Sequence, residues 1–203
     1  MVRITSHEEL RGRYRQPTDR VLRKELDHVD AHCRRFIERS PFLVLATVGN
    51  DGRVDASPRG DHPGFVQVDD HHTLLIPDRP GNNRIDSLTN LVERPGAAVL
   101  FMIPGVDETL RVNGAIVIHD DDDLRQRFAV GGRLPATVLV MRTEQVYLHC
   151  AKAFMRSKLW DPESWSTTRP VPTLGEMIHD QIGEVGPAET QDEMVARYRE
   201  NLY

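Results

Sequence analysis

The stretch FLVLATVGNDGRVDAS, residues Phe42–Ser57, shows the pattern that decides the fold. Phe42–Val48 is a short apolar run rich in β-branched residues, which is typical of a strand. Gly49–Gly52 reads GNDG, four residues that favour a tight turn, and Val54–Ser57 resumes an extended pattern. The two runs and the turn between them predict neighbouring antiparallel strands.

The same texture continues along the chain, where short apolar runs alternate with clusters of turn-forming residues. Two helical segments interrupt it, Asn83–Glu93 before Pro95 and Leu124–Val130 after a run of aspartates. At least six strands without helix-length crossovers indicate a mainly β, α+β fold built as a closed or nearly closed antiparallel barrel. The further strands are expected at Gly64–Val68, Thr73–Pro77, Ala97–Ile103, Thr109–His119 and Thr137–Cys150.

Helical signals flank the barrel residues on both sides. Apolar residues recur at three- and four-residue steps from about Thr18 to Ser40 and predict one continuous helix there, ended by Pro41. Before it, Ser6 and Glu9 match a capping box for a helix over His7–Tyr14. Two further capping boxes predict closing helices in the tail, Thr173 with Glu176 and Thr190 with Glu193.

The composition is that of one globular domain. Charged residues make up 28% of the chain and hydrophobic residues 39%, and the net charge of −5 offers no general reason to bind nucleic acid or an anionic membrane. We expect a single domain over residues 1–203. Within it, residues 1–40 form an N-terminal helical extension, 42–160 the barrel core and 161–203 a C-terminal helical extension.

The chain carries no sign of export, of a membrane span or of a metal site. Its longest apolar runs are far too short to cross a bilayer, and its first ten residues are polar. Cys33 and Cys150 form no CxxC pair, so a reducing cytoplasm is the expected location. His28 and His32 lack a second cluster at ligand spacing, so no metal is expected.

The loop RPGNNR, residues Arg79–Arg84, lies between an expected strand and an expected helix. The first turn of a helix has unpaired N–H groups and a partial positive charge, which suit a phosphate. Arg84 can add a charge-assisted pair of hydrogen bonds, and the amides of Asn82 and Asn83 can donate more. The alternative is an ordinary Asn-capped helix with a solvated arginine, and the spacing alone leaves it open.

A second candidate segment is SPRGD, residues Ser57–Asp61. Side chains alternate along a strand, so Ser57 and Arg59 should share a face, while Pro58 and Gly60 indicate an edge or a bulge with free backbone groups. The alternative is an ordinary edge strand with an Arg–Asp pair on the surface.

Two later segments carry further polar residues. Thr109, Arg111 and Asn113 alternate with apolar neighbours and present a polar face, which is also the default for a strand with one side in water. The segment His149–Trp160 contains three cations and an indole. It could close over a planar anionic cofactor, or it could be a solvated basic turn with Trp160 in the core.

In their order and spacing, these four segments resemble the pyridoxamine-phosphate-oxidase-like superfamily of FMN-binding split barrels, over roughly Phe42–Trp160. Within it the chain is most similar to an uncharacterised bacterial group of FMN-dependent enzymes. The resemblance implies a six-stranded split barrel and a homodimer with FMN at the subunit interface. It maps the phosphate contacts onto Asn82, Asn83 and Arg84, the ring contacts onto Ser57 and Arg59 with Ile76, Pro77 and Asp78 nearby, and further contacts onto Thr109, Arg111, Lys152, Arg156 and Ser157, the last three from either subunit.

The function implied is an FMN-dependent oxidoreductase in which NAD(P)H or a reduced small-molecule substrate delivers hydride to flavin N5. Two alternatives use the same barrel: a reductase that uses the deazaflavin F420, and a non-enzymatic flavin or haem binder. The chain departs from authentic pyridoxamine-phosphate oxidases, because its loop reads Asn82-Asn83-Arg84 instead of a Ser-Arg-Lys type. Its end also lacks their substrate-binding motif, so oxidation of vitamin B6 phosphate is not expected. No residue is assigned a catalytic role.

Overall fold

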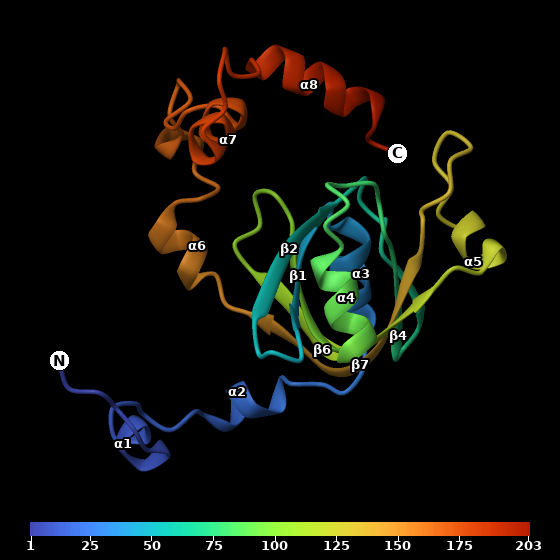
Figure 1. Ribbon diagram of the computed structural model, residues 1–203. Helices are drawn as coiled ribbons and strands as arrows, with labels where there is room; N and C mark the ends of the chain where they lie inside the picture. Colours follow the sequence, from blue (N-terminus) through green and yellow to red (C-terminus); the bar gives the residue numbers. More distant parts are fainter.

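The computed structural model describes residues 1–203 and has one antiparallel sheet at its centre (Figure 1). The sheet has seven strands in the order β2-β1-β5-β6-β7-β4-β3. All seven segments expected as strands join the sheet, including the four-residue edge strand β3, so the six-stranded barrel implied by the resemblance is one strand short. The strands are β1 Phe42–Val48, β2 Val54–Gly60, β3 Gln67–Asp70, β4 Thr73–Pro77, β5 Gly96–Met102, β6 Thr109–His119 and β7 Val138–His149.

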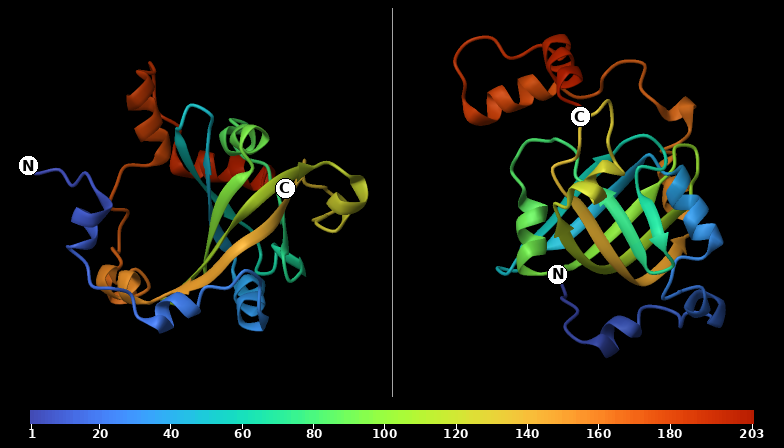
Figure 2. Two further views of the ribbon diagram at one scale, coloured as in Figure 1. Left: turned by 90° about the horizontal axis from the view of Figure 1, so that it is seen from below. Right: turned by 90° about the vertical axis from the view of Figure 1, so that its right-hand side faces the viewer.

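The sheet curls into a barrel that stays open between its two edge strands (Figure 2). Strand β2 is one edge, as Pro58 and Gly60 predicted, and β3 is the other. The long strands β6 and β7 pair with each other inside the sheet, and a bulge interrupts their register between Asn113 and Gly114. The core consists of side chains that alternate inward, such as the fully buried Leu43, Phe101 and Met141.

Two helices pack against the barrel, and the second of them borders the candidate site. Helix α3, Ala31–Arg39, buries Cys33 and Ile37, and helix α4, Asp86–Glu93, buries Leu91 beside strand β1. The predicted start of the second of these helices at Asn83 was wrong by three residues. Asn83 and Ile85 adopt left-handed backbone conformations, with φ of 58° and 53°, which a right-handed helix cannot include.

The single helix expected from Thr18 to Ser40 was wrong, because the structure has two. Helix α2, Asp19–Arg23, is followed by Leu26, which pairs with Val146 of β7 through two backbone hydrogen bonds of 2.9 and 2.8 Å. The carboxylate of Asp30 then accepts from the N–H of Cys33 at 2.7 Å and starts α3. A long-range strand contact has thus replaced the middle of the expected helix.

The other boundaries moved less. The strand expected at Gly64–Val68 begins at Gln67, and the helix expected at Leu124–Val130 is α5, Asp122–Gln126. The capping boxes at Thr173 and Thr190 form at helix starts as predicted. At the short α1, His7–Arg11, Ser6 accepts from the Glu9 N–H, but the Glu9 carboxylate accepts from the N–H of Thr5, so the predicted box is only half formed. The C-terminal helices are α6 Lys152–Ser157, a 3-10 turn at Pro162–Ser164, α7 Leu174–Ile182 and α8 Gln191–Glu200.

Both ends of the chain extend beyond the barrel. Helices α1 and α2 and helices α6 and α7 leave it on the same side (Figure 1), and after α8 the chain returns to the barrel, where Tyr203 contacts Asp61. No helix combines the length and the apolar character needed to cross a bilayer.

Candidate functional site

A cavity of about 580 Å³ opens where the end of edge strand β2 meets the loop between β4 and α4. This volume lies within the roughly 300–1,000 Å³ that small-molecule sites occupy. Two of the predicted segments, SPRGD and RPGNNR, supply most of the walls. The lining residues are Ser57, Pro58, Arg59, Gly60, Phe65, Pro77, Asp78, Arg79, Pro80, Gly81, Asn82, Asn83, Ile85, Leu88 and Ala136.

Arg59 and Asp78 form an ion pair in the wall of this cavity. Their side chains are only 19% and 15% exposed, so the pair is largely withdrawn from water. The Nη1 of Arg59 donates to Asp78, whereas its buried Nε has no hydrogen-bond partner. The wall therefore contains a guanidinium whose charge is neutralised and whose Nε–H is a buried, unpaired donor, and such an orphaned donor is rare in a folded protein.

A second ion pair lies beside the first. Nε of Arg79 donates to Asp61 at 2.6 Å, and its Nη1 donates to the carbonyl of Phe128 at 2.8 Å. Asp61 is 2% exposed and also accepts from the hydroxyl of Tyr203 at 2.7 Å. Burial alone would raise the pKa of Asp61, but the hydrogen bonds from Tyr203, the His62 N–H and Arg79 together hold that pKa below its usual value.

The loop that leads into α4 is strained at the edge of the cavity. Asn83 and Ile85 are left-handed, a conformation that is a genuine outlier for a β-branched residue such as Ile85. Each such residue costs about 1–3 kcal/mol and persists only where the surroundings hold it. Neither asparagine caps the helix: Ile85 is the N-cap and makes no side-chain hydrogen bond, while Asn82 accepts from the N–H of Arg84 at 3.1 Å. The first turn of α4 therefore keeps N–H groups without a side-chain cap.

Arg84 does not line the cavity. Its Nε donates to Asp86 at 2.8 Å, and the two side chains are 72% and 49% exposed. An exposed pair of this kind contributes at most about 1 kcal/mol. Arg84 can therefore leave Asp86 at small cost when a stronger acceptor is present.

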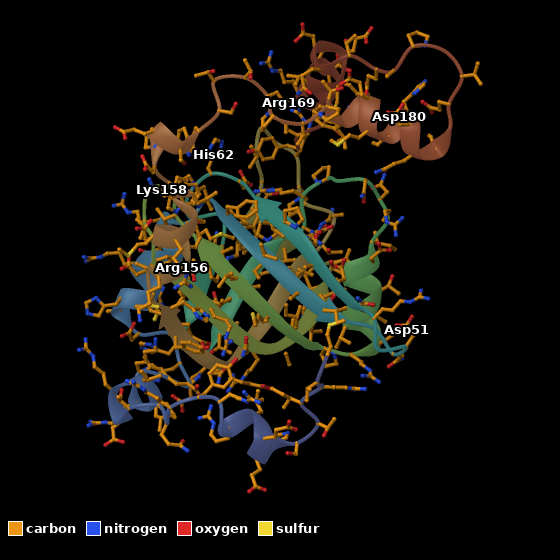
Figure 3. All side chains as sticks on the ribbon, turned by 90° about the vertical axis from the view of Figure 1, so that its left-hand side faces the viewer. Asp51, His62, Arg156, Lys158, Arg169 and Asp180 are labelled. Atoms are coloured by element: carbon orange, nitrogen blue, oxygen red, sulfur yellow. The ribbon has the colours of Figure 1, made fainter.

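The remaining predicted residues lie elsewhere. Ile76 is buried in the core beneath the cavity, and Thr109 is buried as well. Arg111 lies 4.2 Å from the centre of the Tyr147 ring and donates to Gln145 at 3.0 Å, and its buried Nε is unpaired. Lys152, Arg156 and Ser157 are exposed on α6, which stands apart from the barrel in Figure 1 and faces the viewer in Figure 3, where Arg156 is labelled. Apart from Ile76 and Arg84, the candidate residues of one chain thus fall into two groups. The first group lines the cavity: Ser57, Arg59, Pro77, Asp78, Asn82 and Asn83. The second group lies away from it: Thr109, Arg111, Lys152, Arg156 and Ser157.

The second group is strongly basic. Lys24 lies 5.3 Å from the centre of the Tyr147 ring of β7, on the face that also holds His149 of β7 and, on the neighbouring strand β6, Arg111. Burial, followed by the charges of Arg111 and Lys24, lowers the pKa of His149. Trp160 stacks on Phe154 with ring centres 5.6 Å apart and donates to the carbonyl of Val106 at 3.1 Å. The Trp160 indole is therefore half-buried against Phe154 and Val106 of its own chain.

Sequence reasoning missed several residues of the cavity. Arg79 and Asp61 belonged to the quoted segments, so their charges were a usable signal. Phe65, Ile85 and Leu88 carried only an apolar signal. Tyr203 lies 142 positions from Asp61 and had no local signal at all.

These observations define a class: an antiparallel barrel open between two edge strands, with a polar cavity where a strand, a strained loop and a helix meet one of those edges. Residues 29–150 match the family model described as pyridoxamine 5'-phosphate oxidase. The chain therefore belongs to the pyridoxamine 5'-phosphate oxidase family, as the four segments predicted. Members of this family often bind FMN, and some use F420 or haem. No curated protein matches the chain.

Solved structures share the fold at low sequence identity. A variant of HupZ from Group A Streptococcus is 13% identical and aligns over 60% of this chain and 99% of its own, with a TM-score of 0.50. A candidate pyridoxamine 5'-phosphate oxidase from Lactobacillus delbrueckii is 20% identical over 61% of this chain and 98% of its own, with a TM-score of 0.47. An FMN-binding protein from Syntrophomonas wolfei is 13% identical over 58% and 88%, with a TM-score of 0.44.

Proposed function

We propose that this protein binds FMN in the cavity between β2 and the β4–α4 loop and acts as an FMN-dependent oxidoreductase. The observation that carries the proposal is the strained, uncapped entry into α4, which borders the cavity. The left-handed conformations of Asn83 and Ile85 lower the stability of the fold, and strain of this kind clusters at ligand-binding sites. The free N–H groups of the first turn and the amides of Asn82 and Asn83 suit a phosphate.

Arg84 would complete the phosphate contacts by exchanging partners. Its present partner, Asp86, is a single exposed carboxylate, whereas a phosphate has several oxygens and twice the charge. The guanidinium needs only side-chain rotation to turn from one to the other. Because Asp78 and Asp61 already neutralise the charges of Arg59 and Arg79, Arg84 is the cation of this loop that remains available to a phosphate.

The rest of the cavity lining suits a flat, partly polar ring. Phe65, Pro77 and Leu88 supply apolar surface, and Ser57 adds a hydroxyl group. The Arg59 side chain, 19% exposed, can donate a hydrogen bond to a ring carbonyl or ring nitrogen from a guanidinium N–H that Asp78 does not occupy. When bound, FMN supplies two-electron hydride chemistry, and the protein orients it and excludes water. The electron donor would be NAD(P)H or a reduced small molecule.

The carboxylates of this cavity also bear on the choice of cofactor. F420 carries an acidic tail that needs further free cations, yet Asp78 and Asp61 neutralise Arg59 and Arg79. The exposed cations of α6 are not part of the cavity. Within one chain, the cavity therefore offers a free cation for the single phosphate of FMN, whereas the longer acidic tail of F420 would also need cations from a second copy.

The absorbance spectrum of the purified protein tests the proposal. We expect the absorbance bands of an oxidised flavin, about one FMN per chain after reconstitution, and FMN as the chromophore released for mass spectrometry. Competition between FMN and F420 and a titration with haem provide the comparison, since haem would give a Soret band. A protein that stays colourless, and whose melting temperature does not change with excess FMN, would disprove FMN binding.

We propose further that the protein is a homodimer in which the second group of residues completes the cavity of the other copy. The outer face of β1, β5 and β6 carries half-buried apolar side chains such as Val44, Leu100 and Met102 next to Arg111. The N-terminal and C-terminal extensions also expose apolar side chains: Leu22, Met155 and Ile182 are 59%, 64% and 62% exposed. Such surface is normally covered by a partner.

Mixing two variants tests this arrangement. Arg84→Ala and Arg156→Ala are each expected to weaken FMN binding as homodimers. After unfolding and refolding together, each heterodimer should regain one intact site of wild-type affinity, because one of its sites carries both changes and the other carries neither. A mixture that binds no better than its parents, or a chain that light scattering finds to be monomeric with FMN bound, would contradict the shared site.

A further inference from the structure

The end of the chain is fastened to the wall of the cavity through one residue. After α8 the backbone runs to Tyr203, whose hydroxyl donates to Asp61 at 2.7 Å and whose backbone oxygen accepts from Nη1 of Arg133 at 2.6 Å. Both side-chain hydrogen bonds that join residues 191–203 to the barrel involve Tyr203. Figure 1 shows the end of the chain at the same end of the barrel as the loop before α4.

Tyr203 covers the ion pair of the cavity wall. The guanidinium of Arg79 lies 5.3 Å from the centre of its ring, a distance at which a cation is attracted to the ring face. Asp61 receives Tyr203 on one carboxylate oxygen and Arg79 on the other, so one carboxylate connects the tail to a lining residue. The nearly complete burial of Asp61 makes both bonds strong, because water does not compete for them.

We propose that Tyr203 is a positioning residue of the cavity, and that residues 201–203 form a strap that closes its wall by holding Asp61 and Arg79 in place. Few contacts hold the strap, so its release breaks only the two hydrogen bonds of Tyr203 and the contact of its ring with Arg79, without unfolding the barrel. With the strap docked, Arg79 is fixed from three sides, by Asp61, Phe128 and Tyr203. With the strap released, Asp61 is open to water, and the Arg79 wall loosens.

The strap has a consequence for any ligand of the cavity, which under the proposed function is FMN. A fixed wall slows escape of the ligand, so the strap should act on the dissociation rate more than on association. Loss of one charge-assisted hydrogen bond to a buried carboxylate corresponds to about a tenfold change. The pKa of Tyr203 is raised, first by its hydrogen bond to Asp61 and then by burial, so the phenol stays protonated and able to donate at neutral pH.

Three variants test the strap: Tyr203→Phe, removal of residues 201–203, and Tyr198→Phe as the matched control, since Tyr198 is exposed on α8 and stacks on Arg197. Without ligand, hydrogen exchange of the segments 58–65 and 78–84 should be faster in the first two variants and unchanged in the control. With FMN, the first two should lose it about tenfold faster in stopped-flow fluorescence and expose it more to iodide quenching.

The two readouts separate this inference from the proposed function. Exchange rates in Tyr203→Phe equal to those of the wild type would overturn the strap, whether or not FMN binds, and this variant should fold because it keeps the ring. Faster exchange in a protein that binds no FMN in any form would support the strap and reject the flavin.

Discussion

Replacing Arg84 with alanine is expected to weaken FMN binding by about 10- to 100-fold, the largest loss of affinity for any single exposed side chain of this protein. A hydrogen bond to a charged group contributes about 1.5–3 kcal/mol, and each 1.4 kcal/mol corresponds to a factor of ten. Equilibrium titration of the apoprotein, followed by the quenching of flavin fluorescence, measures the change. The loss should shrink at high salt, because screening weakens the contact in the wild type.

Asp86→Asn is the matched control for this experiment. It removes the present partner of Arg84 and also a negative charge in the first turn of α4, where a phosphate would bind. FMN affinity should therefore stay equal or rise severalfold, although the same ion pair has been broken. If Arg84→Ala bound FMN as tightly as the wild type, the phosphate would not lie at this loop, and the assignment of the cavity would fail.

The second large effect concerns stability in the absence of ligand. Arg59→Met should lower the free energy of unfolding by about 3 kcal/mol, since it leaves Asp78, only 15% exposed, without its partner. Replacing both partners, as Arg59→Met with Asp78→Leu, should restore much of that loss because no charge is then buried alone. Urea unfolding of the two single variants and the double variant gives the coupling energy, which we expect to be about 2 kcal/mol.

Arg53→Met is the control for the buried pair. Arg53 contacts Asp51 at 3.4 Å in the same hairpin, but it is 91% exposed, so its removal should change stability by less than about 0.5 kcal/mol. Additive effects of Arg59→Met and Asp78→Leu would show that the two side chains act independently, and the cavity wall would then not depend on their pairing.

Local sequence patterns predicted the strands of this fold well. Phe42–Val48, Thr73–Pro77 and Thr109–His119 stand where their apolar runs placed them. The capping boxes at Thr173 and Thr190 hold both of their reciprocal hydrogen bonds. These features depend on residues within a few positions of one another, so a single sequence contains the information needed to find them.

The errors lie where distant residues compete with local ones. The pattern around Leu26 was helical in period, but its backbone pairs with Val146 of β7. Helix α4 was expected to begin at Asn83, but two left-handed residues delay its start to Asp86. In each case a tertiary contact or a strained turn outweighs a preference of a few tenths of a kcal/mol per residue.

The sequence by itself determined the family, the antiparallel barrel and the two segments that wall the cavity. Each of these follows from the type and spacing of residues that are close together in the chain. Only the tertiary structure decided which charges neutralise one another: Arg59 with Asp78, and Arg79 with Asp61 beneath Tyr203. It also placed Arg111 and helix α6 away from the cavity of their own chain. The physical reason is that ion pairing and burial depend on which surfaces meet when the sheet curls, and residues far apart along the chain carry no local mark of that meeting.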